Sequence, residues 1–437
     1  MPARKIAVIG AGYVGLTTAA TLAAAGHGVT CVDVDRAKVA ELRAGRVALL
    51  EPDLPELVAA GRRAGLLRFT ARLPDALLPP HPPDLVFVCV PTPRGEGGAA
   101  DVSIVEAVAR DLGRLLPPGA AVVLKSTVPV GTADRVRGLL RRPDLPVLSH
   151  PEFLSEGSAV HDCRHPDRLV IGTGTTPADR AAARRLADLY TDLAAPVLLT
   201  GNASAELIKY AANAFLAVKL SYANTLAELC ESVGADIGDV CRGLGLDPRI
   251  APAHLRPSPG WGGPCLPKDT HALLDLARTR QIGFPLVRAA LETNDRQHHR
   301  IADKVRTAAG GCLDGVRIAV YGLAFKAGTA DTRDSPALAV ARLLHAQGAE
   351  LTVYDPAAAN PAGPDDWYQT ADNPYTAAKA ATVVAVLTEW PEFARLDWAL
   401  ISQLMHRPHV VDARRILDPE ALEACGLTVS AVGRGTR

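Results

Sequence analysis

The stretch that decides the fold is Lys5-Ile-Ala-Val-Ile-Gly10-Ala-Gly12-Tyr-Val-Gly15, a short apolar run that leads into a glycine-rich turn. A segment rich in alanine, threonine and leucine follows to about Ala25, and a second apolar run from His27 to Val32 ends in Asp33. The order strand, glycine turn, helix, strand and acid is the context that a Rossmann dinucleotide fingerprint requires. The sequence therefore predicts an α/β domain with a dinucleotide site on its first turn.

Each glycine of this fingerprint has a structural role. Gly10 permits the tight turn, Gly12 lets backbone amides approach a pyrophosphate, and Gly15 allows the helix to pack closely. Tyr13 and Val14 lie within the same turn and belong to the expected cofactor-binding residues.

The acid after the second strand predicts which dinucleotide binds. Asp33 follows Gly15 by 18 residues and can accept both ribose hydroxyls, which favours NAD over the phosphorylated cofactor. Lys38 and Arg36 are candidates for added charge near the cofactor, and a solvated helix start is the alternative for each.

Length and composition limit the classes of protein that fit. At 437 residues the chain exceeds the roughly 250–300 residues that one hydrophobic core usually serves, so two or three domains are expected. Lys and Arg equal Asp and Glu at 47 each, which gives no electrostatic argument for nucleic acid or an anionic membrane as partner. Neither a signal peptide nor a long apolar span is evident, so a cytoplasmic protein is expected. The eight cysteines include no CxxC, so neither a metal site nor a disulfide framework is indicated.

Candidate ligand-binding residues follow the next two buried-type strands and lie in the loop after them. Pro91 and Thr92 come after the run at 85–90, and Thr127 comes shortly after the run at 121–124. Ligands of open α/β sheets bind at the carboxyl ends of strands, so these residues are expected at the same crevice. The loop at 150–157 adds Glu152 and Glu156, for which surface charge is the alternative.

The middle of the chain predicts a long helix and further helical segments. Asn202 to Val233 contains neither Gly nor Pro, and 32 residues would span roughly 48 Å. Glu206, Lys209 and Asn213 recur at spacings of three and four and share one face, with an exposed polar stripe as the alternative. Helical patterning is expected again from Thr270 to about Ala308.

Between these helical segments lies Gly260-Trp-Gly-Gly-Pro-Cys265-Leu-Pro-Lys268-Asp269-Thr270. Small turn residues before Cys265 let a substrate approach the sulfur, and Lys268 and Asp269 place both charge signs nearby. The stretch predicts a nucleophilic thiol, with a buried cysteine in an ordinary turn as the alternative.

The last section repeats the strand, helix, strand pattern without a glycine fingerprint, at about 316–322, 336–346 and 350–354. Lys326, Arg333 and Arg414 follow its strands and suit a second phosphate-bearing ligand, with surface salt bridges as the alternative. We therefore expect an α/β protein with two Rossmann-like doubly wound domains, at 1–200 and 309–437, joined by a long central helix within a helical domain at 201–308.

Eight motifs in order make the chain resemble the UDP-glucose/GDP-mannose dehydrogenase family over essentially its whole length. They are Gly10-Ala-Gly-Tyr-Val-Gly15, Lys125-Ser-Thr-Val-Pro-Val-Gly-Thr132, Pro151-Glu-Phe-Leu-Ser-Glu-Gly157, Pro166-Asp-Arg-Leu-Val-Ile-Gly172, Glu206-Leu-Ile-Lys-Tyr-Ala-Ala-Asn213, Gly262-Gly-Pro-Cys-Leu-Pro-Lys-Asp269, Gly322-Leu-Ala-Phe-Lys326 and Asp331-Thr-Arg-Asp-Ser-Pro336. The resemblance implies an NAD domain, a central helical dimer region and a C-terminal domain that binds the nucleotide of a sugar donor.

The resemblance further implies an NAD-dependent oxidation of a nucleotide-sugar C6 alcohol to the acid through a thioester on Cys265. Implied catalytic partners are Thr127, Glu152, Lys209, Asn213 and Asp269, which order water, activate it or stabilise an oxyanion. Implied cofactor contacts, beyond those of the glycine turn and Asp33, are Lys38, Pro91, Thr92, Thr127, Glu156, Lys268 and Arg333. Implied substrate contacts are Glu152, Phe153, Leu154, Glu156, Lys209, Asn213, Arg249, Gly260, Phe325, Lys326 and Arg414.

Several functions stay open at this point. Lys268-Asp269 resembles the UDP-glucose and GDP-mannose branches of this family more than the N-acetylhexosamine branch, and the helix sequence at 214–224 resembles the UDP-glucose branch. UDP-glucose, giving UDP-glucuronate, is therefore the expected donor, while dTDP-glucose, GDP-mannose and a UDP-N-acetylhexosamine are the alternatives. A catalytically silent binding protein would lack at least one of the expected catalytic residues, and a single-step hydroxyacid dehydrogenase needs neither Cys265 nor residues 312–437. A homodimer through the central helix is expected.

Overall fold

The protein is described from a computed structural model that covers residues 3–79, 82–358 and 367–435. The chain forms two compact units, and each is described by itself. The first comprises Met1–Ala212 and His271–Gln281, and the second comprises Asn213–Thr270 and Ile282–Arg437. The division into three domains expected from the sequence stays a prediction.

An eight-stranded sheet with the order β3-β2-β1-β4-β5-β6-β7-β8 forms the centre of the first unit. Its strands are β1 (Lys5–Ile9), β2 (Gly28–Val32), β3 (Leu67–Thr70), β4 (Leu85–Val88), β5 (Ala121–Leu124), β6 (Val147–Ser149), β7 (Leu169–Thr173) and β8 (Val197–Gly201). All neighbours pair in parallel except β6 and β7, which are antiparallel. Because the chain winds outward from β1 in both directions, the turn after β1 lies at the switch point where such sheets bind ligands.

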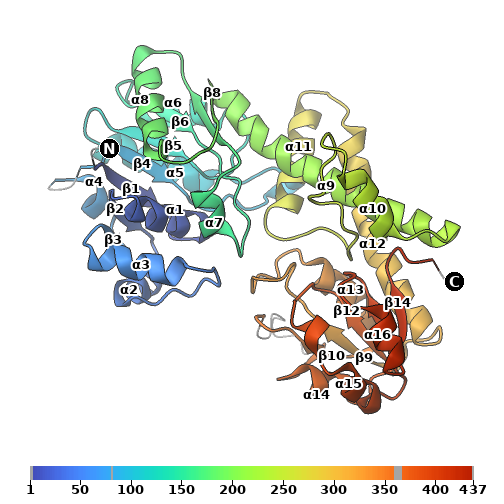
Figure 1. Cartoon of the computed structure of the whole chain (residues 1–437). Coiled ribbons are helices and arrows are strands. Elements are labelled where there is room, and N and C mark those ends of the chain that lie inside the picture. The colour runs from blue at the N-terminus through green and yellow to red at the C-terminus, as the bar shows by residue number, and fades with distance from the viewer. Residues whose placement is uncertain (1–2, 80–81, 359–366, 436–437) are drawn as a thin grey trace. The chain divides into compact units, whose positions relative to one another are not determined.

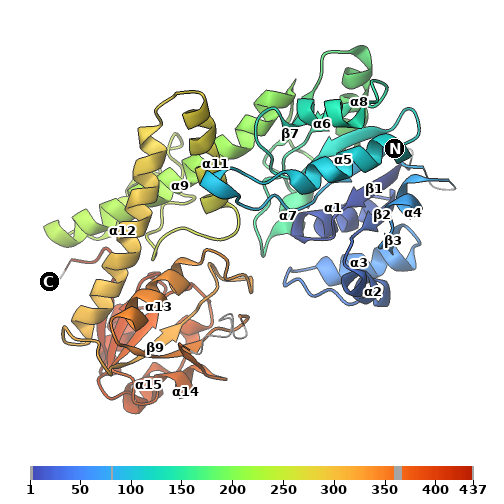
Figure 2. The ribbon, with the colours of Figure 1, turned by 180° about the vertical axis from the view of Figure 1, so that it is seen from behind.

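Helices cover both faces of this sheet (Figures 1 and 2). They are α1 (Tyr13–Ala24), α2 (Arg36–Ala44), α3 (Leu54–Arg63), α4 (Leu73–Leu77), α5 (Ser103–Leu115), α6 (Thr132–Leu140), α7 (Ala159–Arg164) and α8 (Pro177–Ala187), with 3₁₀ turns at Glu96–Gly98 and Asp188–Tyr190. Ile6 and Val8 pack into one core with α1, whereas Ala7 and Ile9 pack into the opposite core with α5. Strands with both faces buried are continuous apolar runs, as the sequence of β1 is.

The helical middle section begins with α9 (Asn202–Val233), whose bounds match the prediction. It continues with α10 (Ile237–Gly245), α11 (Leu266–Thr279) and α12 (Pro285–Ala308). The helical stretch expected at 270–308 is thus two helices, because Gln281 has a positive φ of 57° and Pro285 starts a new helix. Proline has no amide hydrogen and therefore suits the first turn, where that hydrogen would have no partner.

A second, all-parallel sheet with the order β11-β10-β9-β12-β13-β14 confirms the second Rossmann-like domain. Its strands are β9 (Arg317–Tyr321), β10 (Glu350–Tyr354), β11 (Gln369–Thr370), β12 (Val383–Val386), β13 (His409–Asp412) and β14 (Thr428–Ala431). The helices are α13 (Pro336–Ala346), α14 (Pro374–Ala378), α15 (Trp398–Leu404) and α16 (Pro419–Ala424), with a 3₁₀ turn at Phe393–Arg395. Among the described helices of the whole chain, none is both long and apolar enough to cross a bilayer.

Candidate active site

The glycine turn after β1 has the close packing that its sequence predicts. A β-carbon on Gly15 would lie 1.9 Å from the carbonyl oxygen of Gly10, and one on Gly10 would lie 2.5 Å from that of Cys89. Gly10 also has a positive φ of 99°. At Gly12, which precedes α1, a β-carbon would meet nothing within 4 Å. This open space at a helix N-terminus fits a pyrophosphate, which backbone amides there can bind.

Asp33 lies directly beside this turn. Its carboxylate accepts hydrogen bonds from the amides of Ala11 and Asp35, both at 2.9 Å, and pairs with the Lys38 ammonium at 3.1 Å. Burial opposes its ionisation, but these amides and Lys38 hold the pKa of Asp33 below its ordinary value. Asp33 is therefore a fixed anion, as an acceptor for ribose hydroxyls should be, and the turn with Asp33 fits NAD.

The ends of β4 and β5 are joined by a side-chain hydrogen bond. The Thr92 hydroxyl, buried at 7% exposure, donates to the Thr127 carbonyl oxygen at 2.8 Å. The Ser126 hydroxyl donates to the Val90 carbonyl oxygen at 2.6 Å and reinforces the same link. The structure thus brings Thr127 and the Pro91-Thr92 segment together at the ligand-binding edge of the sheet.

Glu152 and Lys209 form a buried ion pair, with a carboxylate oxygen 3.0 Å from the ammonium nitrogen. Both side chains are less than a tenth exposed. Burial opposes the charge on Glu152, yet Lys209 and the Leu154 amide hold the pKa of Glu152 below its ordinary value. The Phe153 ring lies 5.4 Å from the Lys209 ammonium and 3.9 Å from the Arg168 guanidinium carbon. The expected loop and helix residues are therefore in contact, and the exposed-stripe alternative is wrong for Lys209.

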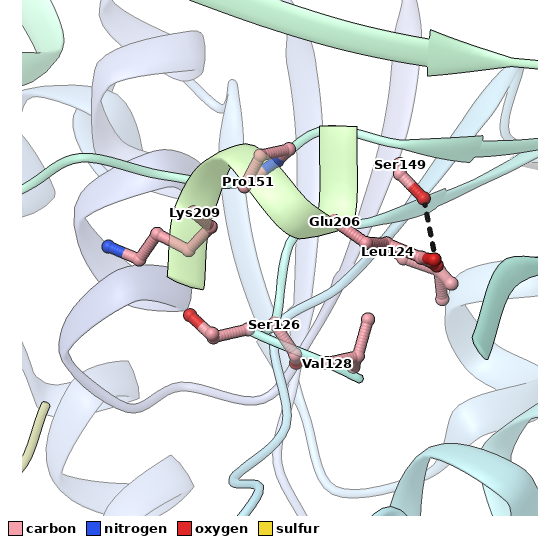
Figure 3. A pocket seen from close by; sticks show the side chains of 8 residues that line it. Leu124, Ser126, Val128, Ser149, Pro151, Glu206 and Lys209 are labelled. Carbon is pink, nitrogen blue, oxygen red and sulfur yellow. Dashed lines mark hydrogen bonds between the residues drawn. The ribbon is translucent and has the colours of Figure 1, made fainter. Parts of the chain in front are cut away.

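Glu206, one turn before Lys209, points to the other side of a small pocket (Figure 3). It accepts from the Gly131 amide at 2.7 Å, the Ala133 amide at 2.8 Å and the Ser149 hydroxyl at 3.3 Å. Burial raises the pKa of Glu206 to about 7, although these donors act in the opposite direction. Glu206 therefore ties α9 to the start of α6, a contact that the sequence did not predict.

In the second unit, buried side chains hold the backbone before the thiol. Asn294 accepts from the Trp261 amide at 2.8 Å and donates to its carbonyl oxygen at 2.9 Å, while the Trp261 indole donates to Ser221 at 2.9 Å. A β-carbon on Gly260 would lie 2.6 Å from His298. Cys265 itself is exposed, so the alternative of a buried structural cysteine is wrong.

Asn213 and Asp269 meet directly beneath this loop. The Asn213 amide nitrogen donates to the Asp269 carboxylate at 2.6 Å, and Lys268 pairs with the other carboxylate oxygen. Asp269 is fully buried, and its own amide donates to the Cys265 carbonyl oxygen at 2.9 Å. Because a buried carboxylate needs such partners, this cluster fixes the first turn of α11 below the thiol.

Four basic residues expected to contact substrate or cofactor lie in the second unit, and their neighbours differ. Arg414 donates to the carbonyl oxygens of Leu387 and Phe325, and its side chain is 10% exposed. Arg333 binds Asp331 through two nitrogens, and Arg249 pairs with Asp247 while 87% exposed. The Lys326 ammonium lies 5.8 Å from the Phe325 ring. The substrate and cofactor roles of these residues stay predictions.

Some partners of the expected residues were missed at the sequence level. Glu51 accepts a hydrogen bond from the hydroxyl of Tyr13, and burial, followed by this bond, raises the pKa of Tyr13. Lys125, buried at the end of β5, helps to keep Glu152 ionised. Asn294 lies within an otherwise ordinary polar helix. Glu51 directly follows the apolar pair Leu49-Leu50, which was a usable signal for its burial, whereas Asn294 offered none.

Comparison with known proteins agrees with this geometry. The NAD binding domain of the UDP-glucose/GDP-mannose dehydrogenase family matches residues 4–194, its central domain matches 203–296, and its UDP binding domain matches 319–419. UDP-glucose 6-dehydrogenase of Rhizobium meliloti is 42% identical over 98% of this chain and 99% of its own length. The UDP-glucose 6-dehydrogenase TuaD of Bacillus subtilis is 39% identical over 99% and 93%.

Solved structures give the same result. A UDP-glucose dehydrogenase from Pyrobaculum islandicum superposes with a TM-score of 0.89 at 34% identity, covering 100% of this chain and 98% of that one. A UDP-D-ManNAc dehydrogenase from Pyrococcus horikoshii gives 0.86 at 28% identity, over 98% and 99%. Because all three domains of the family match in order and a relative is 42% identical over nearly the whole chain, this chain belongs to the UDP-glucose/GDP-mannose dehydrogenase family and is an NAD-dependent nucleotide-sugar dehydrogenase.

Proposed function

We propose that the protein oxidises the C6 alcohol of UDP-glucose to the carboxylate of UDP-glucuronate in two hydride transfers, with Cys265 holding the intermediate. The observation that carries this proposal is the exposed thiol on a loop fixed by buried hydrogen bonds. UDP-glucose is preferred over dTDP-glucose, GDP-mannose and a UDP-N-acetylhexosamine because relatives at 38–42% identity are named UDP-glucose 6-dehydrogenases.

The first oxidation converts the C6 alcohol to an aldehyde. An NAD held at the glycine turn would accept one hydride in each oxidation, so two NAD molecules would be reduced per sugar, the first leaving as NADH before the second binds. The hydroxyl proton passes to a water ordered by Thr127, Lys209 and Asp269 as C6 gives up its hydride. Lys209 and Asp269 are buried, so their side chains are already held in place before the reaction. Fixed side chains suit this task because no entropy is lost in ordering them.

The second oxidation takes place on the cysteine adduct. The sulfur of Cys265 adds to the aldehyde carbon, and the oxygen gains a proton, which leaves a thiohemiacetal with one hydrogen on carbon. Loss of that hydrogen as hydride and of the hydroxyl proton gives a thioester. Water then attacks the thioester carbon, the carbon–sulfur bond breaks, and the acid and the thiol are released. Glu152 or Asp269 takes the proton of this water, while Lys209 and Asn213 donate to the oxyanion.

Replacement of the thiol tests this route. We expect Cys265→Ser to lower acid formation by at least about a thousandfold while NADH and UDP-glucose still bind, because serine is a far weaker nucleophile for the adduct. Cys312→Ser, at another exposed cysteine, is the matched control and should keep full activity. Undiminished acid formation by Cys265→Ser would refute the thioester.

Counting NADH per sugar consumed tests the reaction and the donor together. With UDP-glucose, dTDP-glucose, GDP-mannose and UDP-N-acetylglucosamine in parallel, we expect two NADH per UDP-glucose and little with the others. Two NADH with a different donor would keep the mechanism and change the substrate. One NADH per sugar would remove the second oxidation from the proposal.

We further infer a homodimer through α9. Leu207, Phe215, Tyr222, Leu229 and Val233 are each 42–67% exposed. At about 100° per residue they fall within a sector of about 80° on one side of the helix. A stripe of large apolar side chains on one exposed face indicates an interaction surface, and a second copy would bury it.

Mass measurement by light scattering tests the dimer. Phe215→Asp with Tyr222→Asp should yield a monomer, because two carboxylates would have to be buried in the interface. Leu246→Asp, at an apolar residue that is 82% exposed outside α9, is the control and should leave the mass unchanged. A doubly substituted protein with the mass of the unmodified one would exclude this face as the interface. The expected cytoplasmic location stays a prediction.

A further inference from the structure

Glu51 is a buried carboxylate, 4% exposed, that none of the steps above uses. One carboxylate oxygen accepts from the Tyr13 hydroxyl and from the Gly157 amide, the latter at 2.8 Å. The other accepts from the Val160 amide at 3.0 Å. The Gly157 amide also donates to the Tyr13 hydroxyl oxygen. Glu51 thus has three donors from two segments that are distant from it in sequence.

These donors come from the two parts of the first unit that are expected to contact ligands. Tyr13 is the first residue of α1 and follows Gly12, where the turn leaves room for a pyrophosphate. Gly157 ends the loop that begins with the buried Glu152, and Val160 lies in the first turn of α7. The Val160 amide has no partner within its own helix, as is usual for a first turn. Glu51 therefore links the cofactor turn to the sugar loop at 151–157.

The chemistry of this link depends on a carboxylate. An ionised carboxylate only accepts hydrogen bonds, and all three of its partners here are donors. Burial and the bond to Glu51 raise the pKa of Tyr13, so its hydroxyl stays protonated and donates. A glutamine in place of Glu51 would turn an amide hydrogen toward at least one of these donors. The three hydrogen bonds therefore require a carboxylate at position 51, whereas a packing contact would require only a side chain of similar size.

We propose that Glu51 is a positioning residue that couples cofactor binding at the glycine turn to the conformation of the sugar loop. A dinucleotide against Gly12 restrains Tyr13, Tyr13 restrains Glu51, and Glu51 holds the amides of Gly157 and Val160. The proposal deepens the proposed function and rests on its assignment of the 151–157 loop to the sugar.

Hydrogen exchange of the Gly157 amide in the sugar loop and of the Val160 amide in α7, with and without NADH, tests this coupling. NADH alone is the probe, because the reduced cofactor cannot accept a hydride and therefore binds without turnover. In the unmodified protein we expect NADH to slow exchange of the Gly157 and Val160 amides by about fivefold or more, within the usual range of coupling between sites. Glu51→Gln should exchange faster at both amides without ligand and lose the NADH effect.

Two further variants keep the test decisive. Tyr13→Phe removes only the hydroxyl, so it should keep slow basal exchange at Val160 while losing the NADH effect, even if Glu51→Gln folds poorly. Glu56→Gln, at an exposed acid of α3, is the control and should match the unmodified protein. A merely structural role for Glu51 would lower the melting temperature and leave the response to NADH unchanged in the folded fraction.

A second titration separates this inference from the choice of substrate. NADH should raise the affinity for UDP-glucose by about fivefold or more in the unmodified protein. In Tyr13→Phe it should leave that affinity unchanged. If UDP-glucose fails to bind while exchange at Gly157 still responds to NADH through Tyr13, the proposed donor is wrong and the coupling holds. An equal NADH response in all variants, or none in the unmodified protein, would overturn the role of Glu51.

Discussion

Gly15→Ala tests the packing that holds the cofactor turn, because the new methyl group would meet rigid backbone. Its carbon would lie 1.9 Å from the Gly10 carbonyl oxygen, 2.9 Å from the Gly10 carbonyl carbon and 3.1 Å from the Cys89 β-carbon. Ordinary contact begins at 3.4 Å, so α1 and the turn have to separate by about 1.5 Å, the difference between 3.4 and 1.9. Leu16 and Ala19 of α1 are buried in the core, so the helix cannot move freely.

The expected loss of stability follows from two opposing effects. Forcing a methyl group into a filled space costs about 3 kcal/mol, and two backbone atoms in conflict justify the upper end of the usual range. Alanine favours a helix over glycine by about 1 kcal/mol. The net loss of about 2 kcal/mol should lower the melting temperature by roughly 4–8 °C for a unit of this size. NADH affinity should fall at least about tenfold, because the turn no longer presents its amides in place.

Gly12→Ala is the matched control, three residues away in the same turn. Gly12 has a φ of −76°, which alanine adopts readily, and its β-carbon would have no neighbour within 4 Å. Stability should change by less than about 1 kcal/mol, whereas NADH affinity should still fall about tenfold because the methyl group lies where the pyrophosphate approaches. Thermal unfolding followed by circular dichroism and calorimetric titration with NADH separate the two effects. Equal stability of both variants would refute the packing argument.

Three other changes have expected outcomes. Glu206→Gln should flatten the pH dependence of the free energy of unfolding. Because the pKa of Glu206 is raised to about 7 in the folded protein, its contribution to stability falls by up to about 3 kcal/mol as pH rises from about 4.5 to about 7. Urea unfolding of both proteins at pH 4.5 and 7.5 measures this difference. Lys209→Met should destabilise by about 3–5 kcal/mol by leaving Glu152 buried without its cation, and adding Glu152→Gln should restore most of the melting temperature. Asn294→Ala should lower kcat about tenfold with NADH affinity unchanged, because both backbone groups of Trp261 lose their partner; steady-state kinetics with NADH titration checks this.

Local patterns predicted the parts of the fold that depend on neighbours in sequence. The glycine turn was readable because only glycine avoids the close contacts at Gly10 and Gly15. The bounds of α9 were readable because 32 residues without Gly or Pro have no internal reason to stop. The break between α11 and α12 was missed, although Gly283 and Pro285 stand at it, because the apolar spacing continues on both sides.

The contacts that organise the site join residues far apart in sequence, and spacing carries no information about them. Glu51 lies 38 residues from Tyr13 and 106 from Gly157, and Asn294 lies 33 residues from Trp261. The family resemblance implied Glu152 and Lys209 as site residues, but their ion pair was not predicted. Patterning predicts which residues are buried or exposed along one element, whereas the partner of a buried polar group is decided by tertiary packing.

The helix α9 shows how these two kinds of information combine. Asn202, Glu206, Lys209 and Asn213 lie within about 60° of one another around the helix, and the exposed apolar stripe lies about 180° away. Asn202 binds the backbone of β6, and Glu206 binds the start of α6, so the first two residues fix the helix to the sheet. Lys209 lies within one turn of Glu206. The buried hydrogen bonds of Asn202 and Glu206 therefore fix the backbone from which the flexible Lys209 side chain extends. A helix anchored in this way cannot slide along its axis without breaking both sets of bonds, which keeps the ammonium group at Glu152.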